Sequence, residues 1–133
     1  MRATRYRRHG RGDRGALTLS YVIIVPVFLL AVMVIAQASL WYLARQAALA
    51  AARQGADAAR VVGAPLGAGP RAALAFARSA ASGYLLGPSA DSRGSSSTTV
   101  AIRVRGKVPS LVPGVAINVS QVARAPVEQF TTP

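Results

Sequence analysis

Few residues of this 133-residue chain could carry acid–base or nucleophilic chemistry, and their spacing keeps them apart. Cysteine is absent, so thiolate chemistry and a cysteine-rich metal site are excluded. The acids fall in separate segments, and no two are spaced to pair carboxylates for acid–base work. They are Asp13, Asp57, Asp91 and Glu128.

The remaining candidates for catalysis lack partners of the right type. His9, the single histidine, lies in an arginine-rich arm, and we interpret it as part of a solvated charged tail. Ser20 lies in an apolar stretch with no histidine on its far side to activate it. The sequence also has no glycine-rich phosphate loop and no zinc-ligand spacing. We therefore expect no enzyme activity, no cofactor, no metal and no small-molecule substrate.

Of the formal charge of +12, +5 lies within residues 1–15. Residues 1–15 hold six arginines and one aspartate, directly before a long uncharged stretch, which is where positive-inside topology places cations. The remaining positive charge is spread thinly and lacks the basic-aromatic clusters of nucleic-acid binders, so we do not expect a nucleic-acid partner. The arginines expected to set the topology are Arg2, Arg5, Arg7, Arg8, Arg11 and Arg14.

The uncharged stretch runs from Gly15 to Ala44 and predicts a membrane helix over residues 16–44. A hydrocarbon core needs roughly 20 apolar residues in helical form, and this stretch exceeds that length. A core helix of so small a protein would show a polar face, which is missing here. Trp41 and Tyr42 fit the outer aromatic belt. We expect a single-pass protein in contact with membrane lipid, its N-terminus cytoplasmic and its C-terminal part extracytoplasmic.

A cleaved secretory signal is the main alternative to this anchor. The basic start and the triplet Ala36-Gln37-Ala38 imitate a signal peptide with its cleavage site, although the apolar run from Leu17 to Ile35 exceeds the usual 7–15 residues. Cleavage after Ala38 would release a small secreted binding module.

Helical character continues past the membrane segment as an extension over residues 45–62. Strong helix formers dominate it, and Gly63 followed by Pro65 predicts its end, giving one helix from about Ala16 to Val62. Pro26 lies inside this helix, where a membrane segment tolerates it as a kink. Arg53 and Asp57 are four residues apart, and Asp57 and Arg60 are three apart, so both pairs are spaced to meet on one face.

Small residues recur on the extension at a spacing that lets another helix approach closely. The abundance of alanine in this chain could produce the same pattern by composition alone. The residues expected to pack against a helix are Ala48, Ala51, Ala52, Gly55, Ala56 and Ala59.

Residues 63–133 predict a small exported α+β domain. Pro70 suits the first turn of a second helix ending near Ser82-Gly83, and a polar loop is expected from Gly87 to Ser97. The residues from Thr99 to Val108 alternate as a half-buried strand should, with Val100, Ile102 and Val104 pointing one way and Arg103 and Arg105 the other.

A turn at Pro113-Gly114 leads to a partner strand from Val115 to Val119, with a bulge expected near Ser120-Gln121 because Val122 falls out of phase. The expected fold is a membrane-anchored α+β protein: a long N-terminal transmembrane helix extended beyond the membrane, a short second helix and a small antiparallel hairpin. Its expected domains are 1–15, 16–44, 45–62 and 63–133.

The junction Arg14-Gly15-Ala16 to Pro26 resembles the start of TadE-like proteins, pilin-like components of tight-adherence (Flp-type) pilus and secretion systems. In that family an arginine-glycine pair opens an apolar helix with a proline at the place of Pro26. The block from Ala44 to Arg60 is similar to the family's second common block. The stretches Val108–Gly114 and Ala125–Glu128 are similar to actinobacterial members.

The resemblance implies a pilin-like fold and a structural role beside other pilin-like proteins, as a minor pilin or an assembly factor. It implies prepilin peptidase cleavage between Gly15 and Ala16. The family usually carries glutamate at the fifth position after the cut, where this chain has Ser20. Serine cannot supply the carboxylate that pairs with a neighbouring subunit's N-terminal amine. An unprocessed membrane protein whose basic arm binds anionic lipid or nucleic acid stays an alternative.

Overall fold

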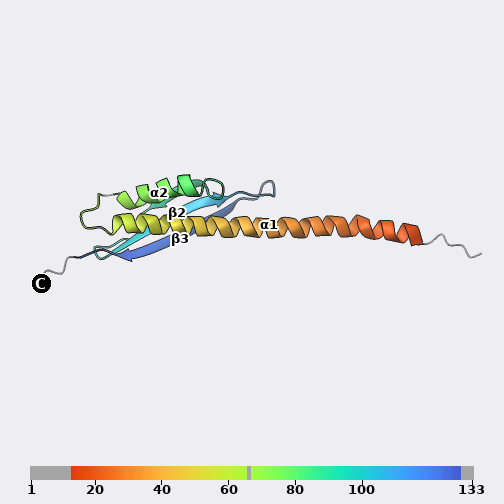
Figure 1. Ribbon diagram of the computed structural model, residues 1–133, viewed down its shortest axis with the longest axis horizontal. Coiled ribbons are helices and arrows are strands. Elements are labelled where there is room, and N and C mark those ends of the chain that lie inside the picture. Colours follow the sequence, from red (N-terminus) through yellow and green to blue (C-terminus); the bar gives the residue numbers. More distant parts are fainter. Residues whose placement is uncertain (1–12, 66, 130–133) are drawn as a thin grey trace, which may run out of the picture. The chain divides into compact units, whose positions relative to one another are not determined.

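The computed structural model describes residues 13–65 and 67–129, with side chains from Ser20 onward. The order of elements confirms the predicted α+β fold (Figure 1). They are α1 (Asp13–Ala59), α2 (Ala68–Ala80), β1 (Leu86–Asp91), β2 (Thr99–Val108) and β3 (Ile117–Pro126). The chain divides into two compact units, of which the first ends at Ile35 and the second begins at Ala36.

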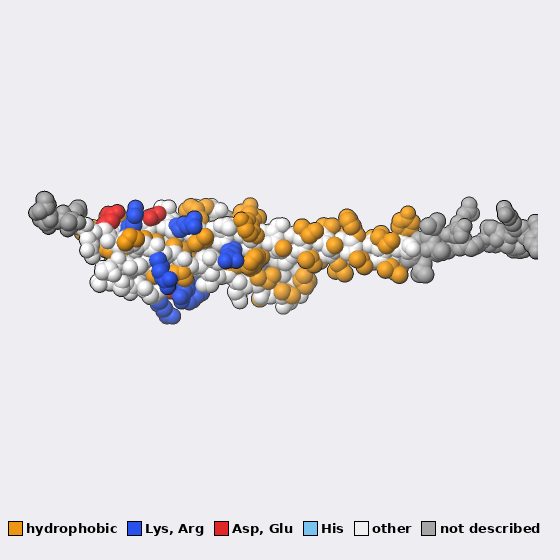
Figure 2. Space-filling view, turned by 90° about the horizontal axis from the view of Figure 1, so that it is seen from below, with side chains coloured by type: hydrophobic (Ala, Val, Ile, Leu, Met, Phe, Trp, Pro, Cys, Tyr) orange, Lys and Arg blue, Asp and Glu red, His pale blue; other side chains and the backbone are white. Residues whose placement is uncertain are grey.

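The described part of the first unit is a single helical segment that passes through Pro26 without interruption. Its large apolar side chains are open on all sides, with exposed fractions such as 66% for Tyr21, 65% for Phe28 and 67% for Val34. Figure 2 shows apolar side chains covering the visible face of this helix. Among the described residues, α1 is the one helix long and apolar enough to cross a membrane. A helix that is apolar all round is stable in lipid or a protein core, and not in water.

The second unit packs helices against one face of a three-stranded antiparallel sheet of order β1-β2-β3. Figure 1 shows α2 running beside the C-terminal part of α1, with the strands on one side of both. The predicted alternation of the second strand is confirmed, because Val100, Ile102 and Val104 are buried while Arg105 is exposed. The β2–β3 pair runs without a break from Thr99↔Pro126 to Val108↔Ile117.

The predicted bulge near Ser120-Gln121 is wrong. Val122 pairs with Arg103 on the outer face of the sheet, and Val119 and Ala123 take the buried positions, so the strand keeps its phase. The irregularity of this sheet lies between Leu86 and Ser89 of β1.

The loop predicted from Gly87 to Ser97 is wrong in its first half, because Leu86–Asp91 forms the edge strand β1. Gly87 and Pro88 are poor strand residues, but an edge strand tolerates proline at a bulge. The predicted hairpin is therefore confirmed as β2–β3 and is extended by a third strand. The helix ends also shift slightly: α1 stops before Gly63, whose φ is +77°, and α2 begins after Gly67, whose φ is +80°.

The core between the helices and the sheet is built mainly from alanine. Five alanines of α1 and three at or beside α2 are at most 2% exposed, and the larger buried side chains are Leu85, Ile102 and Val104. The helices meet most closely at two glycines. A Cβ added to Gly55 would lie 2.7 Å from the Gly69 carbonyl oxygen, and one added to Gly69 would lie 2.9 Å from the Ala59 Cβ. The small residues therefore set how near α2 and β2 can come to α1.

We expect the replacement Gly55→Val to lower the free energy of unfolding of the second unit by roughly 2–3 kcal/mol, because overpacking forces backbone to move. The matched change Gln54→Val, at the exposed neighbouring position, should stay within about 0.5 kcal/mol of the parent. Denaturant unfolding in detergent micelles, followed by fluorescence of Trp41, the single tryptophan, measures both. Equal losses at the two positions would contradict the close helix contact.

Candidate functional site

The described acidic side chains from Ser20 onward are all engaged in ion pairs. Asp57 and Glu128 pair with Arg60 at 3.5 Å and 3.8 Å, and Asp91 pairs with Arg105 at 3.4 Å. The same part of the chain contains no group of three or more residues suited to hold a metal ion. These carboxylates act as partners for arginine, so the candidate sites of this protein are surfaces and junctions.

The predicted processing junction falls at the start of α1. The Gly15–Ala16 bond lies in the first turn of the helix, and Ser20 follows as an exposed residue. Arg14 is helical in its backbone, but its side chain lies outside the described ones. Five more arginines of the predicted topology set also lie outside the described residues: Arg2, Arg5, Arg7, Arg8 and Arg11.

The small-residue face of α1 lies inside the second unit. Ala48, Ala51, Ala52, Gly55 and Ala56 are buried, and Ala59 packs partly buried against the same core. The helix that approaches this face most closely is α2 of the same chain. A side chain at Gly55 would meet Gly69, Ala73 and Ile102. The packing surface expected from the sequence is therefore already covered within the chain.

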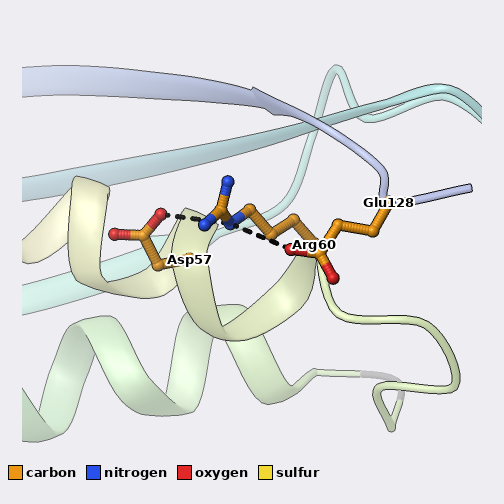
Figure 3. Close-up of polar contacts among 3 residues, drawn as sticks. All are labelled: Asp57, Arg60 and Glu128. Carbon is orange, nitrogen blue, oxygen red and sulfur yellow. Dashed lines mark ion pairs between the residues drawn. The ribbon is translucent and has the colours of Figure 1, made fainter.

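The C-terminal end of α1 is tied to the segment that follows β3 (Figure 3). The Arg60 guanidinium lies between the carboxylates of Asp57 and Glu128, and the Glu128 amide donates a hydrogen bond of 3.0 Å to the Arg60 carbonyl. The Asp57–Arg60 pair confirms the predicted i,i+3 contact. The link to Glu128 was not predicted, because no local pattern connects these two distant segments.

A second unpredicted contact joins α1 to the loop between β2 and β3, residues 109–116. The Gln37 Nε2 donates a hydrogen bond of 3.2 Å to the Pro109 carbonyl, and the Leu111 amide donates one of 2.8 Å to the Gln37 Oε1. The sequence held one signal: Gln37 is a primary amide directly after a long apolar run, where such a group needs partners. In the sequence, Gln37 was assigned only to the possible cleavage triplet Ala36-Gln37-Ala38.

The outer face of the sheet is basic. Register places Arg103, Arg105 and Lys107 of β2 and Arg124 of β3 on this face, with Asp91 as the acid among them. In Figure 2 several Lys and Arg side chains lie over the folded part of the chain. A shallow depression of about 410 Å³ lies beside Ser89, Arg105 and Lys107. The described residues that line this depression include no aromatic side chain, and Trp41 lines a smaller depression beside it, next to Asn118 and Ser120.

Near the start of the second unit, Trp41 and Arg45 form a cation–π pair with 5.5 Å between the guanidinium carbon and the ring centroid. Trp41 is 39% exposed and Tyr42 is 56% exposed. Amphipathic rings of this kind suit the boundary between lipid and water. Together with the exposed apolar helix, these features define a class: a protein with an apolar anchoring helix that continues into a small α+β domain.

The family within this class is indicated by the N-terminal helix. Residues 15–57 match the model of the family described as TadE-like protein, so this segment, about a third of the chain, is similar to that family. The resemblance predicted from residues 14–26 and 44–60 is thereby confirmed. No curated protein and no solved structure matches the chain. The match supports a protein associated with tight-adherence pilus systems, in which TadE-like members are structural. The match and the apolar helix also indicate a membrane anchor.

We expect Arg60→Gln to lower the free energy of unfolding by less than about 1 kcal/mol, because both ion pairs are largely exposed and solvent screens them. The loss should shrink in about 1 M salt, where the screening length falls to about 3 Å. Arg53→Gln, an exposed change on the same helix, is the control. A loss that persists unchanged in salt would show that packing of the arginine stem holds the two segments together.

Proposed function

We propose that this protein is a membrane-anchored minor pilin or pseudopilin that acts structurally in assembly of a tight-adherence pilus or secretion system. The observation that carries the proposal is the position of the family match. It covers residues 15–57, which comprise both the exposed apolar helix and the extension built into the folded unit. Pilin-like function needs one continuous helix of this kind, with an apolar part for lipid or neighbouring helices and a part that carries a folded domain.

The proposed orientation has the N-terminus in the cytoplasm. The arginines of the basic arm, residues 1–15, oppose its transfer, and residues 63–133 form the exported domain. The proposed membrane helix spans 16–44 and the extension 45–62. Burial along α1 supports a helix that leaves its exposed apolar part and enters the protein core over several residues. Leu40 packs partly against the core, and Ala44 is fully buried in it.

Contacts with other pilin-like proteins are proposed for the apolar helix. The small-residue face from Ala48 to Ala59 is covered by α2 and β2, so it offers little room to a second chain. The side chains from Tyr21 to Val34 are open and apolar, and helices in lipid associate through packing of such surfaces. The apolar helix then serves lipid and partner helices alike.

Retention of the anchor is favoured over secretion by signal peptidase. Cleavage after Ala38 would remove Gln37, and with it both hydrogen bonds that hold the loop after β2. The remaining peptide would keep the alanine core but lose this tether. The alternative is an unprocessed anchor whose basic arm contacts anionic lipid. It differs from the leading proposal in that residues 1–15 are retained.

Sequencing the N-terminus of the protein isolated from its native membrane tests the proposal. We expect the mature chain to begin at Ala16, because prepilin peptidase would cut after Gly15. A start at Ser39 would identify a secreted protein and contradict the proposal, and a start at Met1 would leave an unprocessed anchor. Gly15→Leu should abolish the cut, whereas Gly10→Leu, within the same arm, should leave it intact.

The orientation is tested by replacing the six arginines of the arm with glutamine. We expect a several-fold fall in the fraction of molecules whose C-terminal domain is outside, because each cation near the helix opposes its own transfer. Protease protection of the C-terminal domain in inverted membrane vesicles measures the fraction. Replacing six cations of the second unit, Arg71, Arg78, Arg93, Arg103, Lys107 and Arg124, with glutamine removes the same charge and should leave orientation unchanged. The opposite pattern would contradict the N-in assignment.

A further inference from the structure

The loop between β2 and β3, residues 109–116, exposes apolar side chains to solvent. The loop itself contains no charged residue. Leu111, Val112 and Val115 are 44%, 40% and 48% exposed. The sequence contains no charged residue from Val108 to Ala123. A cluster of this kind on a small domain marks a surface that meets something apolar.

Several backbone groups of this loop are hydrogen-bonded within the loop or to Gln37. The Val115 amide donates to the Val112 carbonyl across Pro113 and Gly114, and the φ of +80° at Gly114 fits the predicted type II turn. The Ser110 hydroxyl donates to the Val112 carbonyl and accepts from the Val112 amide. A loop whose polar groups bond internally can approach a lipid phase at low cost.

The position of the loop along α1 is fixed by Gln37. Its amide binds the loop at both Pro109 and Leu111. Within the proposed membrane helix, residues 16–44, the roughly 20 residues that begin at Leu17 and end at about Ala36 are enough to cross the hydrocarbon core, which leaves the residues from Gln37 onward for the boundary region. Gln37 therefore lies where the hydrocarbon region gives way to headgroups, and the loop is held at the same level.

The residues on either side agree with this level. Trp41 and Tyr42 follow Gln37 by about one turn of helix, roughly 6–8 Å at 1.5 Å per residue, which is the depth of an aromatic belt. The first cations beyond the apolar stretch are Arg45 on α1 and, next to the loop, Lys107 on β2. Long cationic side chains at this distance reach lipid phosphates while their stems stay in the boundary region.

We propose that the loop of residues 109–116 inserts its apolar side chains into the lipid boundary as a second membrane contact of the folded unit. The occupant is membrane lipid, because the loop is continuous, through Gln37, with the helix that anchors the chain. This inference rests on the proposed membrane anchor. With two membrane contacts, the anchoring helix and the loop, the folded unit would have a restricted orientation relative to the membrane surface.

The absence of cysteine makes a direct test possible, because one introduced cysteine labels at a single position. Leu111→Cys and Ser97→Cys are each labelled with an environment-sensitive fluorophore in the full chain. Both residues are exposed, and they flank opposite ends of β2, whose ten residues span roughly 30 Å. The proteins are reconstituted in vesicles of phosphatidylcholine and phosphatidylglycerol, with and without doxyl-labelled lipid.

We expect the label at Leu111→Cys to emit at shorter wavelength and to lose several-fold more fluorescence to doxyl lipid than the label at Ser97→Cys. Aqueous iodide should give the reverse order. Equal iodide quenching at the two positions, in protein that still floats with the vesicles, would overturn the loop contact and leave the anchor standing. Protein that does not float would overturn the anchor and the loop contact together.

Two further measurements separate lipid from other occupants. Doxyl quenching at Leu111→Cys should not change when the protein is diluted into more lipid, and a loss on dilution would mean that a second copy covers the loop. Adding Gln37→Leu keeps α1 apolar and removes the tether, so quenching at Leu111→Cys should fall several-fold while the spectrum at Ser97→Cys stays the same. Unchanged quenching in this double variant would overturn the role of Gln37 in holding the loop at the membrane.

Discussion

The contact of α1 with α2 and β2 at Gly55, Gly69 and Ile102 sets the geometry of the folded unit. A long helix is a rod about 10–12 Å thick with its side chains, and two such rods covering a narrow sheet leave little room for large side chains between them. In this chain the buried helix positions carry small side chains, which lets the helices and the sheet approach closely. Alanine or glycine occupies nearly every buried position of α1 and α2. Larger side chains are left to the sheet side, where Ile102 and Val104 fill the space. The core is therefore close-packed but poor in apolar area, so bonds at its edges matter more than they would in a larger domain.

Those edge bonds lie at opposite ends of the unit. Arg60 holds the chain that follows β3 against the last turn of α1, and Gln37 holds the loop that precedes β3 near the point where the apolar helix ends. Strand β3 is thus linked to α1 at both of its ends. The two links differ in kind, because the first is an exposed ion pair open to salt and the second is a pair of amide hydrogen bonds beside apolar side chains. Salt should therefore weaken the first link far more than the second.

The sequence predicted the elements that have a regular pattern of apolar residues. The alternation around Ile102 predicted β2 with its observed ends, and the uncharged run before Arg45 predicted the exposed apolar helix. Strand β1 escaped prediction because glycine, proline and serine carry little strand preference. The open edge of β2, which needs hydrogen-bond partners, recruits that segment. The phase of β3 was misjudged because Val122 is an apolar residue on the outer face. For the candidate site, the small-residue face followed from spacing, and the junction at Gly15 was implied by the resemblance to TadE-like proteins and stays a prediction. The tethers at Gln37 and Arg60 join residues far apart in sequence, so no local pattern predicts them.

The small-residue face shows how one pattern can serve two purposes that sequence alone does not separate. Alanine and glycine at helical spacing permit any helix to come close, whether it belongs to the same chain or to another. In this chain the domain's own α2 takes that place, which is why the proposed contacts with other pilin-like proteins are assigned to a different stretch of α1. The stretch before Gln37 is open on every side and is apolar throughout, which suits lipid and neighbouring helices equally. A glutamine at the border between these two stretches would be costly in hydrocarbon without partners. Its bonds to Pro109 and Leu111 satisfy the amide and remove that cost.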